Sequence, residues 1–124
     1  MTPTKLALLP VDNLCEKIQV TESNKYHGST YYNGVYIQNG YFHGRPVWNW
    51  NNLATITWDI VNGVEGWTIS GQNKDGTGKV VRFLTYANVQ CPGDATDWMY
   101  VNTGWSGSQN QPAPELTITA LNGD

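Results

Sequence analysis

The chain has 124 residues and a net charge of -3, and it carries six Trp and seven Tyr beside two Phe. This length suits one domain with one core. The seven basic residues are scattered singly, which argues against nucleic-acid binding because displacing counterions from phosphates needs clustered Lys and Arg. No apolar run approaches the length of a membrane-spanning helix, so we expect no membrane insertion.

The organisation predicted from the sequence is an N-terminal arm over residues 1–14, a single β domain over 15–121 and a short tail over 122–124. The arm contains two prolines and no sustained apolar period. Alternation begins after Cys15, where Ile18 and Val20 alternate with polar residues, which is typical of a strand with one buried face. Residues 23–32 are predicted to form a loop followed by an edge strand.

Residues 33–50 are predicted to form a hairpin. Two runs of strand-forming residues flank the pairs Asn39-Gly40 and His43-Gly44, which tolerate the positive φ of tight turns. Pro46 lacks an amide donor, so the second arm is expected to begin there or to run along a sheet edge. Arg45 is expected to brace this hairpin, because its planar guanidinium can stack on rings or hold backbone carbonyls.

The remainder of the chain also alternates with the period of strands. In residues 53–60 the alternation predicts that Ala54, Ile56, Trp58 and Ile60 face the core. Asn62-Gly63 is predicted to turn the chain. Further strands are predicted around 67–69 and over 79–86, 97–101 and 115–121, with residues 104–114 as a loop. The sequence therefore predicts an all-β fold, a compact antiparallel barrel or sandwich of roughly six to eight short strands with little or no helix.

The two cysteines, Cys15 and Cys91, belong to no CxxC pair and have no metal-ligand spacing to the histidines. A disulfide between them is one interpretation. The alternative is two unrelated buried thiols, since two cysteines alone say little about the compartment.

Several short motifs resemble a small uncharacterised β module that recurs in secreted or surface multidomain proteins of marine invertebrates and protists. They are Cys15-x-x-Ile18-x-Val20, Gly34-Val35-Tyr36, the stretch from Gly40 to Trp48 that matches an "NGRPVY" hairpin, Ile56-Thr57-Trp58, Gly66-Trp67-Thr68-Ile69, the Cys91-Pro92 turn, Trp98, and Pro114-Glu115-Leu116-Thr117-Ile118. His43 and Trp48 depart from this pattern, which has Asn and Tyr at these places. The resemblance implies an extracellular β module with a disulfide and no catalytic residues to transfer.

Aromatic rings are the residue type in surplus. We expect three or four large rings to fill a core of this size, and the strand patterns already place Tyr36, Trp48, Trp58, Trp67 and Trp98 there. The rings left over can stack on the C–H faces of sugars, while neighbouring amides satisfy hydroxyls. The predicted ligand-binding residues are Trp50, Asn49, Asn51, Asn52, Trp105, Tyr31 and Tyr41. The alternative is that these rings only cover loops or the ends of the sheet.

No catalytic residue, metal site or cofactor is predicted. Asp94 and Asp97 beside Trp98 could hold calcium or act as a glycosidase pair, but a turn after Cys91-Pro92-Gly93 explains them equally. His27 and His43 lack an oriented third partner. A small hydrolase that uses Asp94 or Asp97 with a histidine is therefore the third choice among the functions.

The sequence favours a non-catalytic extracellular module that binds a glycan or polysaccharide, as a lectin does. The alternative is an adhesive or structural module that binds other extracellular proteins through the same rings.

Overall fold

The computed structural model describes residues 15–22, 32–51, 53–61, 63–72, 79–104 and 107–121. In this part of the chain nine antiparallel strands form one sheet in the order β8-β7-β6-β5-β4-β3-β2-β1-β9. The strands are β1 (Lys17–Thr21), β2 (Gly34–Phe42), β3 (Arg45–Trp50), β4 (Ala54–Val61), β5 (Val64–Gln72), β6 (Lys79–Thr85), β7 (Met99–Gly104), β8 (Gly107–Pro112) and β9 (Thr117–Leu121). One short 3-10 turn, η1 (Pro92–Asp94), lies between β6 and β7.

The all-β class predicted from the sequence is confirmed, although the sheet has nine strands and not six to eight. One of the additional strands is β8, which lies within the predicted loop 104–114. It forms a hairpin with β7, in register from Met99↔Pro112 to Gly104↔Gly107. No helix long and apolar enough to cross a membrane occurs within the described ranges.

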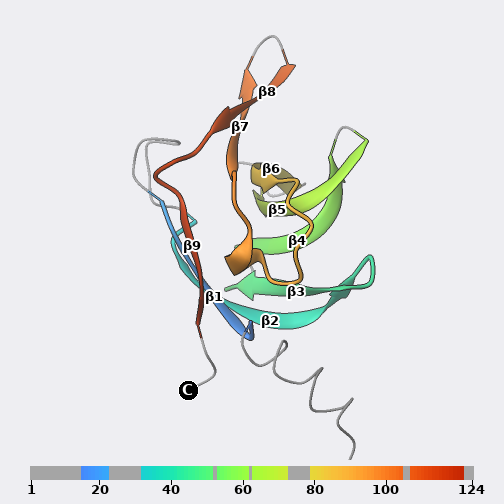
Figure 1. Cartoon of the computed structure of the whole chain (residues 1–124), viewed down its shortest axis with the longest axis vertical. Coiled ribbons are helices and arrows are strands. Elements are labelled where there is room, and N and C mark those ends of the chain that lie inside the picture. Colours follow the sequence, from blue (N-terminus) through green and yellow to red (C-terminus); the bar gives the residue numbers. More distant parts are fainter. Residues whose placement is uncertain are drawn as a thin grey trace, which may run out of the picture.

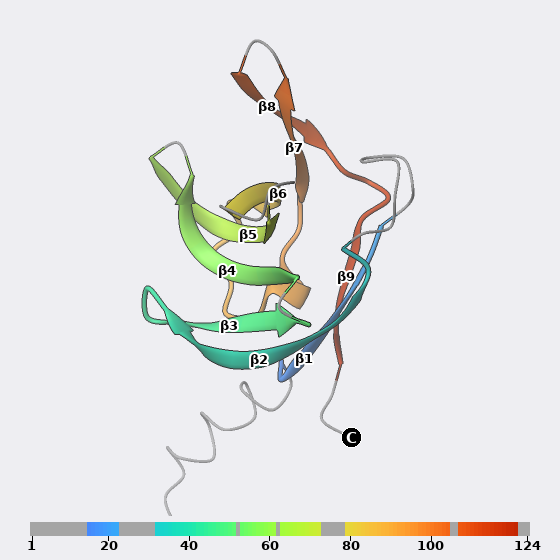
Figure 2. The same cartoon turned by 180° about the vertical axis from the view of Figure 1, so that it is seen from behind.

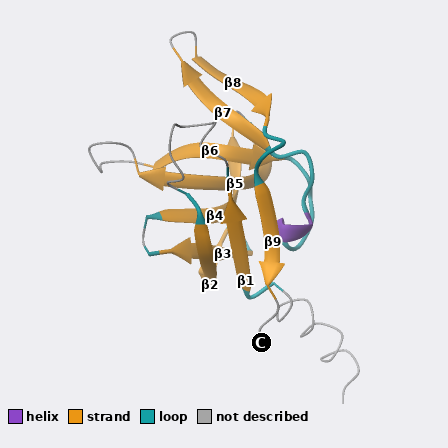
Figure 3. Cartoon of the chain, turned by 90° about the vertical axis from the view of Figure 1, so that its left-hand side faces the viewer, coloured by secondary structure: helices purple, strands orange, loops and turns teal. Residues whose placement is uncertain are grey.

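The sheet curls into an open half-barrel (Figures 1 and 2). Strands β1 to β8 follow one another as antiparallel neighbours, and β9 then returns to pair with β1. The segment between β6 and β7 crosses the hollow of the curl, and Figure 3 shows its η1 turn beside β9. Among the described strands, β8 and β9 each have only one neighbour, so the barrel is not closed between them.

The β2–β3 hairpin is the predicted one. His43 and Gly44 form its turn with φ values of 53° and 79°, the positive values that match the twist of a two-residue hairpin. The ladder shifts register between Gln38 and Tyr41, which identifies a bulge next to Asn39-Gly40.

The second arm begins at Arg45, one residue before the predicted Pro46, and the edge-strand alternative is wrong because β3 lies between β2 and β4. Pro46 is tolerated there because the β3–β4 pairing starts only at Trp48↔Ile56. The missing amide therefore costs no hydrogen bond in that ladder.

Alternation places the core on the concave face of the sheet. Ala54, Ile56 and Trp58 of β4 are buried as predicted, whereas Ile60 is exposed. Ile60 pairs with Glu65 close to the end of the β4–β5 hairpin. The same alternation therefore continues beyond the part of the strand that the core covers.

More rings are buried than the expected three or four. Seven are buried in the described residues, namely Tyr32, Tyr36, Trp48, Trp58, Trp67, Phe83 and Trp98. All five rings that the strand patterns assigned to the core are among them. A curled sheet has a deep concave face, which accommodates more large side chains than a flat layer does.

Cys15 and Cys91 form a disulfide across a sequence separation of 76 residues. Cys91 directly precedes η1, and Cys15 lies two residues before β1. The bond therefore ties the segment after β6 to the segment that enters β1. The interpretation as a disulfide is thus confirmed. Of the predicted loop and edge strand over 23–32, residues 23–31 lie outside the described part of the chain.

We expect the double variant Cys15→Ala/Cys91→Ala to be less stable than the native chain by about 4 kcal/mol, because the disulfide closes a long loop in the unfolded state. Urea unfolding of both proteins measures this difference. An equal midpoint and slope for the two proteins would show that the covalent link is dispensable.

Candidate functional site

Three indole rings form the centre of the concave face. Trp67 meets Trp48 edge-on at a centroid distance of 5.7 Å and meets Trp58 edge-on at 5.4 Å. The guanidinium carbon of Arg45 lies 3.8 Å from the Trp58 ring centroid, within the range of a cation–π contact. The rings and this cation form one packed unit, so these indoles are not free to bind a ligand.

Arg45 also holds the crossing segment between β6 and β7. Its Nη1 donates to the carbonyl oxygen of Val89 at 3.1 Å, and its Nη2 donates to Oδ1 of Asn88 at 2.6 Å. Trp67 Nε1 donates to the same Val89 carbonyl at 2.8 Å. Arg45 therefore braces the crossing segment, whereas the sequence predicted that it braces the hairpin.

Trp50 is half-buried, and one of its sides is committed to packing. Its ring stacks on Tyr36 at a centroid distance of 5.9 Å and an interplanar angle of 30°. The indole also lies directly over Gly34, where a β-carbon would come within 2.3 Å of Nε1. Trp50 is thus less available than the sequence suggested, although its burial is only partial.

Of the asparagines predicted around Trp50, Asn49 does not share its face of the sheet. Asn49 precedes Trp50 in β3, and successive strand residues point to opposite faces of a sheet. Asn51 is exposed at the following turn, with φ of 49°. The remaining predicted residues, Asn52, Trp105 and Tyr31, lie outside the described part of the chain.

Tyr41 is the most exposed large ring among the described residues, with 70% of its surface accessible. It lines a cavity of about 190 Å³, called here the Tyr41 pocket, whose other lining residues are Cys15, Gln38, Gly44, Pro46, Trp48 and Gln90. Tyr41 and Pro46 are direct partners across the β2–β3 ladder. Tyr41 and Trp50 therefore lie toward opposite ends of β3 and do not form one continuous platform.

Two glutamines stand at the Tyr41 pocket, one from β2 and one from the crossing segment. The side-chain amides of Gln38 and Gln90 form no hydrogen bond with the described residues. Sequence analysis missed both, since Gln90 is brought to Gln38 only by the path of the crossing segment. For Gln38 the sequence held only a weak signal, which is that the predicted hairpin brings it opposite Trp48.

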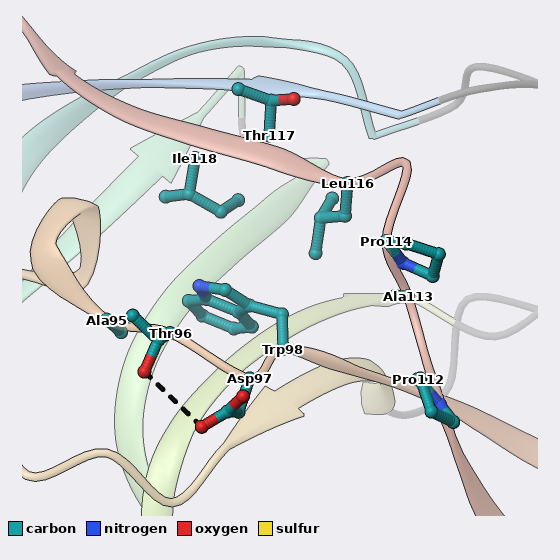
Figure 4. A pocket seen from close by; sticks show the side chains of 10 residues that line it. All are labelled: Ala95, Thr96, Asp97, Trp98, Pro112, Ala113, Pro114, Leu116, Thr117 and Ile118. Atoms are coloured by element: carbon teal, nitrogen blue, oxygen red, sulfur yellow. Dashed lines mark hydrogen bonds between the residues drawn. The ribbon is translucent and has the colours of Figure 1, made fainter.

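A larger cavity of about 490 Å³ lies at the open side of the half-barrel (Figure 4). It is called here the Trp98 cavity and is lined by residues 95–98, 112–114 and 116–118. A second cavity of about 480 Å³ shares Asp97, Trp98 and Pro112 with it and extends along Tyr86 and Met99. Trp98 therefore stands between two hollows.

The acidic pair predicted near Trp98 is spread along the chain leading to this cavity. Asp94 ends η1 and is exposed, and its amide donates to the Cys91 carbonyl at 2.9 Å. This backbone turn includes Asp94 but not Asp97, whereas the sequence allowed one Asx-type turn as the explanation of both residues. Asp97 is also exposed and has φ of 58°. No group of three or more His, Cys, Asp or Glu that could hold a metal occurs among the described residues.

The histidines give no further support for catalysis. His43 is exposed in the β2–β3 turn, and its ring stacks on Phe42 at 3.9 Å. His27 lies outside the described residues.

Glu22, directly after β1, is a buried carboxyl that sequence analysis did not single out. It is 3% exposed, and neither carboxyl oxygen has a hydrogen-bond partner of good geometry in the described part of the chain. Burial raises the pKa of Glu22 to about 7, and the nearby backbone amide of Tyr32 opposes this increase only in part. Burial, followed by the neighbouring Tyr32 and Glu22, also raises the pKa of Tyr36.

We predict that stability falls as the pH rises from about 4.5 to 7, because the unfolded state then loses the Glu22 proton that the folded state retains. The raised pKa corresponds to a loss on the order of 3 kcal/mol above pH 7, relative to acidic pH. Glu22→Gln should remove this dependence and be more stable than the native chain at pH 8. Urea unfolding at pH 4.5, 6 and 8 tests this, with the exposed Glu16→Gln as control; identical pH profiles for native and Glu22→Gln proteins would contradict it.

No protein family, curated protein or solved structure matches this chain. The resemblance to the β module of marine invertebrates and protists therefore stays a prediction.

Proposed function

We propose that this domain is a non-catalytic extracellular module that binds carbohydrate. The observation that carries the proposal is the Tyr41 pocket, where a strongly exposed ring stands beside the amides of Gln38 and Gln90. The ring offers a flat apolar face for the C–H groups of a sugar, and each amide can both donate to and accept from hydroxyls. The disulfide supports an oxidising, extracellular compartment.

The size and charge of the Tyr41 pocket narrow the ligand. None of the described residues that line it is an Asp, Glu, Lys or Arg, so none of them selects a sulfate, a carboxylate or a cation. Its volume of about 190 Å³ is below that of ordinary drug-sized sites, which are roughly 300–1,000 Å³. A single neutral sugar residue suits it, with the rest of the glycan lying outside over the hairpin.

Tyr41→Ala should weaken binding of the best neutral glycan from an array by about tenfold, because it removes the stacking face. Gln90→Ala should also weaken binding, since it removes an amide that contacts hydroxyls. Isothermal titration of the native and variant proteins measures both effects. Tyr86→Ala is the matched control, because Tyr86 is an exposed tyrosine outside the pocket.

The same titrations show whether the sugar binds at the Tyr41 pocket or near Trp50, which lie toward opposite ends of β3. If Trp50→Ala abolishes binding and Tyr41→Ala does not, the sugar site lies at Trp50 and the assignment to the Tyr41 pocket is wrong. If no glycan on a broad array binds, the carbohydrate proposal as a whole fails.

A second candidate function is protein–protein adhesion, favoured by Val35 and Ile37. Both are exposed on β2, on the face opposite the buried Tyr36. Apolar side chains exposed side by side on a sheet mark possible contact surfaces.

If this surface mediates self-association, Ile37→Lys should abolish a concentration-dependent increase in mass in sedimentation experiments. Gln111→Lys is the matched control, since Gln111 is exposed on β8, far from β2 in the order of the sheet. A native chain that stays monomeric at all concentrations would exclude self-association through this face.

A further inference from the structure

The Trp98 cavity contains an indole whose polar group is left without a partner. Trp98 is 8% exposed, and its Nε1 is buried without a hydrogen bond in the structure. Two other indoles show the ordinary situation. Trp48 Nε1 donates to the Cys15 carbonyl at 2.7 Å, and Trp67 Nε1 donates to the Val89 carbonyl at 2.8 Å. Buried donors are nearly always satisfied in native proteins, so this exception calls for an acceptor.

Figure 4 shows how the cavity surrounds this ring. Leu116, directly before β9, and Ile118 of β9 point toward the indole, and the indole nitrogen is on the side of Ile118. Ala113 and Pro114 add further hydrocarbon to the wall. These side chains form an apolar wall beside the Trp98 indole, whose buried N–H is a donor in need of an acceptor, while Thr96, Asp97 and Thr117 add polar groups to the lining.

The rim of the Trp98 cavity determines which charge can enter. The exposed Asp97 lies there, beside a Thr96 hydroxyl that approaches its Oδ2 at 3.4 Å. Among the described residues, no Lys, Arg or His lines the cavity. A carboxylate facing a site without a compensating cation disfavours an anionic ligand.

We propose that the Trp98 cavity is a binding site for a small aromatic molecule that carries no negative charge and presents an oxygen acceptor to Trp98 Nε1. The volume of about 490 Å³ is within the range of ordinary ligand sites, roughly 300–1,000 Å³. The aromatic body packs on Trp98, Leu116 and Ile118, and the oxygen satisfies the indole donor. This site is separate from the Tyr41 pocket and does not depend on the carbohydrate proposal.

The geometry also requires a small movement. Trp98 Nε1 is closed to solvent in the free protein, so the ligand oxygen reaches it only when a covering side chain changes rotamer. Ile118 is the side chain next to the nitrogen in Figure 4. Its methyl signals should therefore respond to binding together with the indole N–H.

Three probes of similar size separate the contributions: benzamide is neutral with a carbonyl acceptor, benzoate is its anionic counterpart, and toluene has no acceptor. We expect benzamide to shift the Trp98 indole cross-peak of the ¹⁵N-labelled chain saturably and to leave those of Trp48 and Trp67 in place. Trp98→Phe identifies the cross-peak by its loss. Benzoate and toluene should bind several-fold more weakly than benzamide.

Asp97→Asn tests the charge without disturbing the backbone, because Asn tolerates positive φ as well as Asp does. It should raise benzoate affinity severalfold while leaving benzamide affinity unchanged. Asp94→Asn is the matched control, since Asp94 is exposed but does not line the cavity. Tyr41→Ala should have no effect on any of the three probes.

Two results would overturn the proposal. One is the absence of any Trp98 shift with benzamide up to its solubility limit. The other is equal binding of benzamide, benzoate and toluene to the native chain, because the cavity would then recognise neither the oxygen nor the charge.

Discussion

The carbonyl oxygen of Val89 is the point on which the interior of the half-barrel depends. It accepts hydrogen bonds from Trp67 Nε1 at 2.8 Å and from Arg45 Nη1 at 3.1 Å. A part-buried carbonyl with two donors, one of them charged, fixes the crossing segment over the concave face. Gln90, the next residue, is thereby placed at the Tyr41 pocket, and the disulfide at Cys91 holds the same segment to the start of β1.

The sequence predicted the parts of this structure that depend on local periodicity. The period-two pattern identified the strands and placed Tyr36, Trp48, Trp58, Trp67 and Trp98 in the core, where they are buried. The β8 strand was missed because its Gly, Ser, Gln and Asn residues have low strand propensity. Backbone pairing with β7 makes this segment a strand although its residues do not favour one.

The candidate sites could be predicted only in part, because they depend on contacts between distant segments. The exposure of Tyr41 follows from its place beside a hairpin turn, which the sequence showed. The approach of Gln90 to Gln38 could not be predicted, since it results from the path of the segment between β6 and β7 across the hollow of the sheet. The sequence alone could have shown that Asn49 and Trp50 lie on opposite faces of the sheet, because adjacent residues of a strand point in opposite directions.

The surplus of rings has a different meaning once their positions are known. Seven rings are buried among the described residues, and three of them, Trp48, Trp58 and Trp67, pack edge-on beside Arg45, so abundance of aromatic residues alone does not indicate a binding surface. What distinguishes the two cavities is polar chemistry beside a ring. At Tyr41 it is the amides of the half-buried Gln38 and the exposed Gln90, and at Trp98 it is a buried indole donor without an acceptor among the described residues. Because a folded chain rarely leaves a buried donor unpaired, and because ligand sites combine apolar surface with a few polar groups, these positions identify binding surfaces better than the count of rings does.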